Sequence, residues 1–394
     1  MTQAIASTDV DLFADDVITD PYPAYRELRD QGAVLWMSRY NCWILPRYAE
    51  VFAALRDHGT FSSASGVGLN DVMNDATKGG SSLCTDPPEH DQLRRILGRR
   101  LTARAVNAHT EDFQRRAGIL VDELVEKESF DAVADFSSAF PLSVVPDLLG
   151  CPADGREHLL KWASAAFQAE GPMNERTQAS LPDLQEFIGY VTELSVSANL
   201  SPGSWADQML QEARAGEISD QLLPPLLIDY LGPSIDTTIS ALSTAIWQFA
   251  THPEQWDALR NDRSLIGNVV HEATRFEAPI RGFARHVIHD HDMDGVRLNA
   301  GDWVFVSFAS GNRDERRWDN PDQFDIRRNT AGHLGFGNGV HACVGQGLAK
   351  LETEALFNAL ADRVAAFEVT SPPVWNVHNI LRGIASMPVT IRTR

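Results

Sequence analysis

Residues 335–345 read GFGNGVHACVG and place Cys343 in a glycine-rich turn that leads into a stretch with helical spacing. A lone cysteine is often a small buried apolar residue, and glycines often mark a tight turn, so Cys343 by itself leaves a purely structural role open. The full pattern, F-G-x-G-x-H-x-C-x-G, fixes six of ten positions, and a chance match to it is rare. Glycines allow a backbone to approach a flat cofactor, and amides ahead of a helix can stabilise a thiolate. The turn therefore indicates a cysteine that serves as a ligand.

Composition limits the class of protein. The chain has 394 residues, 43% of them hydrophobic, without a run of about eighteen apolar residues or a start typical of a signal peptide. Its four cysteines are far apart and show no C-x-x-C pairing, which argues against a disulfide framework or a zinc site. The net charge of -20 argues against nucleic-acid binding, which requires a basic surface. We therefore expect a soluble cytoplasmic protein that binds neither nucleic acid nor a membrane.

The spacing of apolar residues predicts a mainly α fold with a small β portion. Nearly every periodic segment between residues 87 and 276 has helical spacing. Strand composition occurs at residues 33–48 and again at residues 283–308. No internal repeat or flexible linker is evident, so residues 21–394 are expected to form a single domain after a loosely held tail at residues 1–20.

A capped helix is predicted at DPPEHDQLR, residues 86–94. Asp86 can serve as the N-cap, with Glu89 as its capping-box partner. The helix then carries His90 and Arg94 at positions i and i+4, on one face. A well-capped surface helix without a binding role is the alternative.

A long helix is predicted at residues 226–247, LLIDYLGPSIDTTISALSTAIW, with polar residues in its interior. Asp236 and Thr237 are costly there unless they are used, because their side chains compete for backbone hydrogen bonds. Pro233 removes one i to i−4 hydrogen bond outright. We expect a local opening of the helix that leaves a groove beside an acid and an alcohol, with a kinked core helix as the alternative.

In this chain order, the three stretches resemble the cytochrome P450 family of heme-thiolate monooxygenases, from about Pro21 to the C-terminus. The resemblance implies a cytochrome P450 fold in which heme b lies between the long distal helix and the cysteine turn. It implies Cys343 as the proximal iron ligand, because a thiolate ligand favours O–O cleavage, with Phe336 packed beside it. The residues that the resemblance assigns to the heme propionates are His90, Arg94, Arg285 and His341.

The resemblance also assigns Asp236 and Thr237 to a proton relay during oxygen activation. The family pattern here has a glycine followed by an acid and a threonine, and residues 233–237, PSIDT, retain the acid and the alcohol but lose the glycine. Behind the heme the family has a buried E-x-x-R pair, which matches Glu272 and Arg275. Gln323 stands where the family often has an arginine that joins this pair, so the rest of the network is open.

Three further stretches are placed around the substrate pocket by the same resemblance. They are most similar to the branch of the family that oxidises para-substituted benzoates and methoxyarenes. The benzoate-binding members have an arginine and an Arg-Ser pair where this chain has Ser65, Ile228 and Asp229. A carboxylate clamp is therefore not expected unless Arg281 points inward. The residues expected in the pocket are Ser65, Val67, Leu69, Phe167, Glu170, Asp229, Gly232, Ile280 and Phe283.

These features predict a monooxygenase that uses O2 and two electrons to hydroxylate or O-demethylate a small aromatic. A lignin-derived methoxyarene is expected, either a guaiacol-like phenol or a para-methoxybenzoate, and the neutral or phenolic form is favoured. One alternative is an enzyme of the same fold that acts on a terpenoid or a biosynthetic intermediate. The other is a non-catalytic heme sensor, which has no need of the Asp236–Thr237 pair.

A run of arginines follows the capped helix in an otherwise acidic chain. It predicts an acidic redox partner, because opposite charges steer two proteins together. The resemblance implies a ferredoxin-type protein supplied by an NAD(P)H-dependent reductase. A solvated helix face with partners inside the protein is the alternative. The arginines are Arg94, Arg95, Arg99, Arg100 and Arg104.

Overall fold

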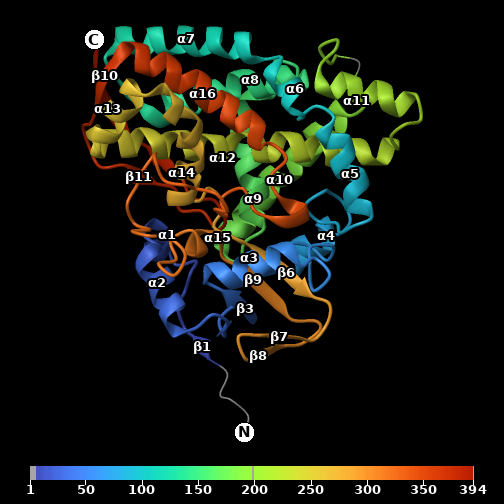
Figure 1. Ribbon diagram of the computed structural model, residues 1–394. Coiled ribbons are helices and arrows are strands. Elements are labelled where there is room, and N and C mark those ends of the chain that lie inside the picture. The colour runs from blue at the N-terminus through green and yellow to red at the C-terminus, as the bar shows by residue number, and fades with distance from the viewer. Residues whose placement is uncertain (1–5, 198, 394) are drawn as a thin grey trace.

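Helix α12 (Leu223–Thr251) runs through the centre of the helical part of the protein (Figure 1). The computed structural model describes residues 6–197 and 199–393. Buried side chains lie on every side of α12 over its C-terminal half, and a helix of this kind is stable only inside a core. The helices α8 (Ala139–Leu149), α9 (Leu159–Ala169) and α14 (Ile266–Phe276) pack against it. The position of α12 therefore fixes most of the helical part.

The other helices complete this layer and connect it to the sheet. The remaining α-helices are α1 (Asp15–Thr19), α2 (Tyr22–Gln31), α3 (Tyr48–Arg56), α4 (Asp71–Thr77), α5 (Glu89–Gly98), α6 (Ala103–Asn107), α7 (Thr110–Lys127), α10 (Glu175–Leu194), α11 (Trp205–Arg214), α13 (Pro253–Asn261), α15 (Phe308–Gly311) and α16 (Gln346–Arg363). The short helical turns are η1 (Ala132–Ser137), η2 (Arg156–His158), η3 (Asp220–Leu222), η4 (Arg263–Leu265) and η5 (Gly339–His341).

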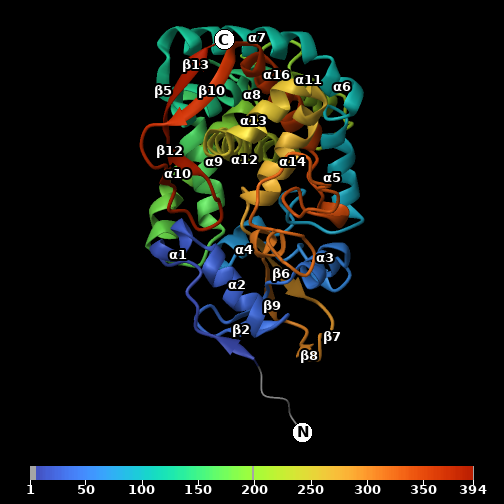
Figure 2. The same ribbon diagram turned by 60° about the vertical axis from the view of Figure 1, so that its left-hand side comes forward.

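The strands gather mainly at the N-terminal end of the molecule, below the helices in the view of Figure 2. A six-stranded sheet has the order β1-β2-β3-β9-β6-β4, and its two central pairs are β3 with β9, parallel, and β9 with β6, antiparallel. A three-stranded sheet, β10-β13-β5, and two hairpins, β7-β8 and β11-β12, complete the β portion. The strands are β1 (Ser7–Thr8), β2 (Leu35–Met37), β3 (Cys42–Leu45), β4 (Phe61–Ser62), β5 (Ser129–Asp131), β6 (Phe283–Val287), β7 (His291–Met293), β8 (Val296–Leu298), β9 (Trp303–Val306), β10 (Val364–Val369), β11 (Val374–Trp375), β12 (Ile384–Ser386) and β13 (Pro388–Thr393).

The prediction of a mainly α fold with a small β portion is confirmed, but the N-terminal segment differs from the loosely held tail that was expected. Within residues 6–20, β1 pairs in parallel with β2, and α1 follows it. Leu12 is fully buried, and its carbonyl accepts a hydrogen bond from Arg281 at 2.6 Å. The polar composition concealed this packing, because only a few apolar residues anchor the segment. Residues 1–5 lie outside the described residues.

One helical stretch, Ala132–Leu149, is long and apolar enough to cross a membrane by length and composition. It comprises η1 and α8, and 67% of it is buried inside the protein. Its contacts with α12 account for its apolar composition, because a core helix meets the same test as a membrane span.

Candidate active site

The cysteine turn owes its shape to glycines. Gly337 and Gly339 have φ angles of +64° and +68°, a region that residues with side chains rarely adopt. A Cβ atom at Gly335 would lie 2.5 Å from the carbonyl oxygen of Thr274 on α14. The glycines are therefore required by the turn and by its close approach to a neighbouring helix.

Phe336 holds the other side of this turn. Its carbonyl oxygen accepts a hydrogen bond from the Cys343 amide at 2.8 Å. Its ring packs edge-on against the imidazole of His271, with 5.6 Å between the ring centroids, and against that of His333 at 5.4 Å. The cysteine is thus bonded to Phe336, whose ring is held by His271 on α14 and by His333.

Cys343 is exposed, and its sulfur lies near Arg94 on α5 and the backbone amides at the start of α16. Burial raises the pKa of its thiol, whereas the backbone amides of Gly345 and Gln346 and the Arg94 guanidinium oppose the rise. The net direction is upward, so the amides alone do not produce a thiolate at neutral pH. A metal cation at the sulfur would deprotonate it outright. The arrangement therefore suits a ligand that becomes charged when a metal binds.

Helix α5 begins at Glu89, and the predicted cap is wrong. The Asp86 carboxylate instead accepts hydrogen bonds from the Ser62 hydroxyl at 2.5 Å and from the Ser63 amide at 3.1 Å. These bonds join the start of α5 to the end of β4. A long-range partner has replaced the local cap, because Asp86 lies beside another strand in the folded chain.

His90, Arg94 and His341 are brought together at the cysteine turn. The rings of His90 and His341 are 4.6 Å apart between centroids, and burial lowers the pKa of both imidazoles, to about 4 for His341. Both Nε2 atoms are buried without a hydrogen-bond partner in the described part of the chain, and the nearest carboxylate oxygen to that of His341, on Asp86, is 3.8 Å away. The Arg94 guanidinium donates to the Ala342 carbonyl.

Arg285 lies on β6, close enough to His341 to lower the pKa of that imidazole. Its side chain is buried, and its Nη1 donates only to the carbonyl of Ala284, at 2.8 Å. Burial lowers the pKa of Arg285 to about 10, so the guanidinium is still charged at neutral pH. Within residues 6–197 and 199–393 it forms no ion pair. A buried cation without a counter-ion is costly, so this position fits an anion that the protein does not supply.

Taken together, these groups fit heme b. The unpartnered Nε2 atoms of His90 and His341 and the unpaired Arg285 are suited to carboxylates such as the heme propionates. The accessible sulfur of Cys343 supplies the soft anionic ligand that iron accepts.

Behind the cysteine turn, Glu272 and Arg275 form the expected buried pair. Both side chains are fully buried, and the guanidinium bonds the two carboxylate oxygens at 2.7 and 2.8 Å. Gln323 contributes only its carbonyl oxygen, which accepts from Arg275 at 3.2 Å. The second cation on Glu272 is Arg328, with its Nε 3.2 Å from the carboxylate. Arg328 was not predicted from the sequence, although the R-R pair after Gln323 was a usable signal.

On the distal side, α12 is continuous from Leu223 to Thr251, so the predicted opening of the helix is wrong. The Thr237 hydroxyl donates to the Pro233 carbonyl at 2.7 Å, and the Ser234 hydroxyl donates to the Tyr230 carbonyl at 2.5 Å. These bonds tie the polar side chains to carbonyls of the helix, which continues past Pro233. Asp236 is different, because its Oδ2 is buried without a partner among the described residues, and burial raises its pKa to about 7.

Five of the predicted pocket residues belong to, or pack against, two clusters of buried hydrophobic side chains. Val67 and Phe283 belong to one buried cluster, and the half-buried Phe167 and Ile280 pack against it. Leu69 packs against the neighbouring cluster below the sheet. Apolar walls are therefore present on the segments that the sequence indicated.

Two predicted pocket residues face elsewhere. The Ser65 hydroxyl lies 3.3 Å from Nδ1 of His286, which is next to Arg285 on β6. Adjacent strand residues face opposite sides of a sheet, so Ser65 lies on the side away from Arg285, and its assignment to the pocket is wrong. Gly232 faces α10, where an added Cβ would meet the Phe187 ring at 3.9 Å.

Glu170 and Asp229 are the two acidic members of the predicted set. Glu170 is 8% exposed, and its Oε2 has no hydrogen-bond partner in the described part of the chain. Asp229 accepts the Ser82 amide on Oδ2 at 2.8 Å. Burial raises the pKa of these carboxyls to about 7 and about 6.

Arg281 does not turn toward this region. Its guanidinium donates to the Tyr25 hydroxyl at 3.0 Å, the Asn379 carbonyl at 3.2 Å and the Leu12 carbonyl at 2.6 Å. These bonds engage all three guanidinium nitrogens of Arg281 with partners within the protein, so we do not expect it to bind a substrate carboxylate.

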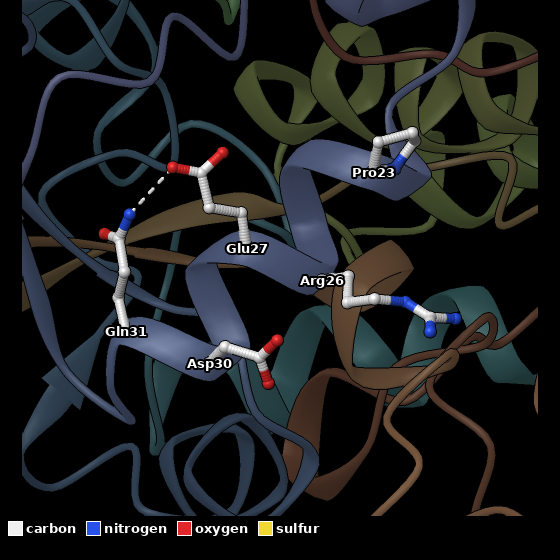
Figure 3. A pocket seen from close by; sticks show the side chains of 5 residues that line it. All are labelled: Pro23, Arg26, Glu27, Asp30 and Gln31. Atoms are coloured by element: carbon white, nitrogen blue, oxygen red, sulfur yellow. Dashed lines mark hydrogen bonds between the residues drawn. The ribbon is translucent and has the colours of Figure 1, made fainter.

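A surface hollow of about 610 Å³ lies elsewhere, along one face of α2 (Figure 3). Glu27 and Gln31 bond each other across it at 3.0 Å, and Arg26 pairs with Asp322 at 2.5 Å. Its side chains already have partners within the protein, and it is open to solvent, so it is not a catalytic pocket.

Comparisons with known proteins agree with this geometry. A family model described as Cytochrome P450 matches residues 174–393. Cytochrome p450 CYP199A2 of Rhodopseudomonas palustris is 39% identical over 97% of this chain and 93% of that protein. Nocardicin C N-oxygenase of Nocardia uniformis is 31% identical over 96% of this chain and 97% of that protein.

Solved structures give the same result. Cytochrome P450 CREJ in complex with (4-ethylphenyl) dihydrogen phosphate has a TM-score of 0.86 at 25% sequence identity, over 95% of this chain and 98% of that one. The chain belongs to the cytochrome P450 family and is therefore a monooxygenase that binds heme b.

Proposed function

We propose that this enzyme hydroxylates or O-demethylates a small neutral or phenolic methoxyarene. When bound, heme b supplies the activation of O2 with two electrons and the insertion of one oxygen atom into a substrate C–H bond. For an aryl methyl ether, ArOCH3, O2, two electrons and two protons give ArOCH2OH and water. The hemiacetal then breaks its C–O bond and releases ArOH and formaldehyde.

The observation that carries this proposal is the charge of the distal region. Arg281 is bonded to three partners within the protein, and Arg94 to the cysteine turn. The ionisable members of the predicted pocket set, Glu170 and Asp229, are both acids, and Asp236 on α12 is a third. An anionic substrate would be repelled there and would find no counter-ion, whereas a neutral arene or a phenol would not.

The walls of the region support an aromatic substrate. Phe167 and Phe283 are the aromatic members of the set, and a flat ring packs well against such side chains. The solved structure of the similar CREJ protein contains an ethylphenyl ring in its bound ligand.

Proton supply is assigned to Asp236 and Thr237. With a pKa raised to about 7, the Asp236 carboxyl can hold and release a proton near neutral pH. The Thr237 hydroxyl donates to the Pro233 carbonyl and can accept a hydrogen bond from a bound water or ligand.

The redox partner is proposed to be an acidic ferredoxin-type protein with an NAD(P)H-dependent reductase. Of the arginine run, Arg100 pairs with Glu212 at 2.8 Å, and Arg99 with the same residue at 3.1 Å. Arg95 and Arg104 are exposed and form no ion pair within the described residues. They are therefore available to an acidic partner.

Substrate binding and product analysis test this proposal. The holoenzyme would be titrated with guaiacol, 4-methoxybenzoate and a monoterpene, while the shift of the heme spectrum toward high spin is followed. We expect the largest shift and stoichiometric formaldehyde with guaiacol. A shift with the benzoate alone would contradict the charge argument, and a shift with the monoterpene alone would favour the terpenoid alternative.

A further inference from the structure

Several buried acids, Asp236 and Glu352 among them, have a carboxylate oxygen without a hydrogen-bond partner in the described part of the chain, and of these only Glu170 belongs to the predicted substrate pocket. Glu170 follows the last residue of α9, one turn after Phe167 and on the same face. Its Oε2 is buried without a hydrogen-bond partner. By contrast, the buried Glu277 is paired with Arg382 at 2.9 Å. Glu170 therefore lacks the partner that a structural acid normally has.

The backbone around Glu170 is fixed by hydrogen bonds. Its carbonyl oxygen accepts from the Leu69 amide at 2.9 Å. The Asn70 side chain donates to the carbonyls of Ala169 and Gly171 at 2.9 and 2.7 Å. These bonds clamp the end of α9 to the segment before α4, so the carboxyl is held in place although its Oε2 has no partner.

Gly68 provides the space for this carboxyl. A Cβ atom at Gly68 would lie 2.5 Å from Oε2 of Glu170. The preceding residue, Val67, accepts a hydrogen bond from the Ala284 amide at 2.8 Å, between Phe283 and Arg285 on β6. The Glu170 carboxyl is thus close to the strand that carries Phe283 and Arg285.

Asp229 places a second carboxyl near the same segment. Its Oδ2 accepts the Ser82 amide, and the negative charges of Asp229 and Glu170 both raise the pKa of Cys84, two residues further on. Asp229 lies on α12, two turns before Asp236 and Thr237. It is therefore on the N-terminal side of the proposed proton-relay residues of that helix. Two carboxyls from two different helices therefore flank one short stretch of chain.

We propose that Glu170 determines substrate specificity by accepting a hydrogen bond from a donor group on the aromatic substrate, with Asp229 adding negative charge nearby. A phenolic hydroxyl and a protonated amine both provide such a donor, and a carboxylate does not. This inference rests on the proposed oxidation of a small aromatic. It adds the group on the ring that the enzyme recognises and the residue that recognises it.

The test uses four probes of similar shape on the holoenzyme: 4-methoxyphenol, 4-methoxybenzylamine, 4-methylanisole and 4-methoxybenzoate. The Kd of each is measured from the high-spin shift of the heme spectrum. In the wild-type enzyme, we expect the phenol or the amine to bind about tenfold more tightly than 4-methylanisole, because only a donor group can bond the otherwise unpartnered Oε2 of Glu170. The relative affinity of the phenol and the amine shows which donor is recognised.

Two substitutions at Glu170 isolate its contribution. Glu170→Leu should remove the advantage of the donor probes and leave 4-methylanisole within about threefold of its wild-type Kd. Glu170→Gln, which keeps an acceptor oxygen, should retain the phenol and weaken the amine about tenfold. The matched control is Glu175→Gln, an exposed acid at the start of α10.

The outcomes separate this inference from the proposed function. If the wild-type enzyme binds 4-methylanisole as tightly as the donor probes, or if both variants leave all four Kd values unchanged, the role of Glu170 is wrong and the aromatic substrate class stands. If none of the four aromatics shifts the spectrum of correctly loaded enzyme, the proposed function fails and this inference fails with it.

Discussion

At the scale of single residues, the cysteine side of the heme site consists of groups that the fold orients but does not pair. Arg285 is buried without a counter-ion, and the Nε2 atoms of His90 and His341 have no partners among the described residues. Each of these arrangements costs free energy in the protein alone. Binding of heme carboxylates would satisfy all three, so these residues should affect heme affinity more than fold.

Replacement of Arg285 by glutamine should speed heme loss. The variant removes the buried cation that faces no protein anion, so we expect heme transfer to apomyoglobin to become about tenfold faster. Arg297→Gln is the control, because Arg297 is half exposed on β8 and pairs with Asp290 and Asp292. An unchanged rate of heme loss in the Arg285 variant would remove it from the propionate site.

Replacement of Thr237 by alanine should uncouple electron use from product formation. Without the hydroxyl of Thr237, proton delivery to the active site is impaired. NADH is therefore still consumed, while the amount of product falls and the amount of hydrogen peroxide rises. The control is Thr238→Ala, a buried neighbour on α12. If Thr237→Ala and Thr238→Ala have the same ratio of product to NADH as the wild-type enzyme, Thr237 has no part in proton delivery.

At the scale of elements, the connector after α15 is tied to α14 by one fully buried carboxylate. Glu272 accepts from Arg275, from Arg328 at 3.2 Å and from the Asp325 amide at 2.9 Å. The glutamine at position 323 takes no part through its side chain. The network therefore contains two arginines, one of them five residues later than the family pattern suggested.

This arrangement makes Arg328 and Gln323 a matched pair of substitutions. Arg328→Ala leaves part of the buried Glu272 charge uncompensated and should lower the free energy of unfolding by about 1–3 kcal/mol. Gln323→Ala keeps the backbone carbonyl and should change it by less than about 0.5 kcal/mol. Thermal unfolding of the two holoenzymes gives the comparison, and equal midpoints would show that Arg328 is not part of the network.

The elements also show which sequence predictions depend on local rules. The turn around Cys343 could be predicted, because positive φ angles require glycine wherever the turn sits in the fold. The cap at Asp86, the opening at Pro233 and the direction of Ser65 could not. Asp86 bonds Ser62 on β4, the Thr237 hydroxyl bonds the Pro233 carbonyl of its own helix, and Ser65 contacts His286 on β6. The sequence alone does not show which of these partners is used.

At the scale of the whole molecule, several acids are buried in a chain that is already strongly acidic. Burial raises the pKa of Glu352 on α16 to about 8, and neither carboxylate oxygen has a partner in the described part of the chain. An acid whose pKa is raised in the folded state binds more protons when folded. Its contribution to stability is therefore lost as pH rises from about 4.5 to about 8.

Between pH 6.5 and pH 8 the buried acids dominate the change in stability, with Glu352 as the one whose pKa is raised furthest and Glu170 and Asp236, at about 7, contributing near the lower end. Buried histidines such as His341 and His378 have lowered pKa values of about 4, so their contribution changes only below their usual value of about 6.5. We expect the wild-type unfolding temperature to fall between pH 6.5 and pH 8. Glu352→Gln should flatten that fall, and Glu354→Gln, a more exposed acid paired with Lys350, should not. Parallel curves for all three proteins would contradict the buried state of Glu352.

The exposed arginines Arg95 and Arg104 lead to a second prediction at the scale of the whole molecule. Replacing both Arg95 and Arg104 by glutamate should lower the rate of reduction by an acidic ferredoxin at low salt, because steering depends on opposite charges. The heme spectrum should not change. Arg392→Glu, on β13 in a different region, is the charge-matched control for one reversal. An unchanged rate at low salt would place the partner elsewhere.

The measurement that tests the assignment of Cys343 most directly is the absorption spectrum of the reduced, carbon monoxide-bound protein. We expect the red-shifted Soret band of thiolate-ligated heme in the wild-type protein and in Cys84→Ala, which removes a different buried thiol. That band should be lost in Cys343→Ala. A histidine-type band in catalytically active wild-type enzyme, or a thiolate-type band that persists in Cys343→Ala, would contradict the ligation of heme iron by Cys343.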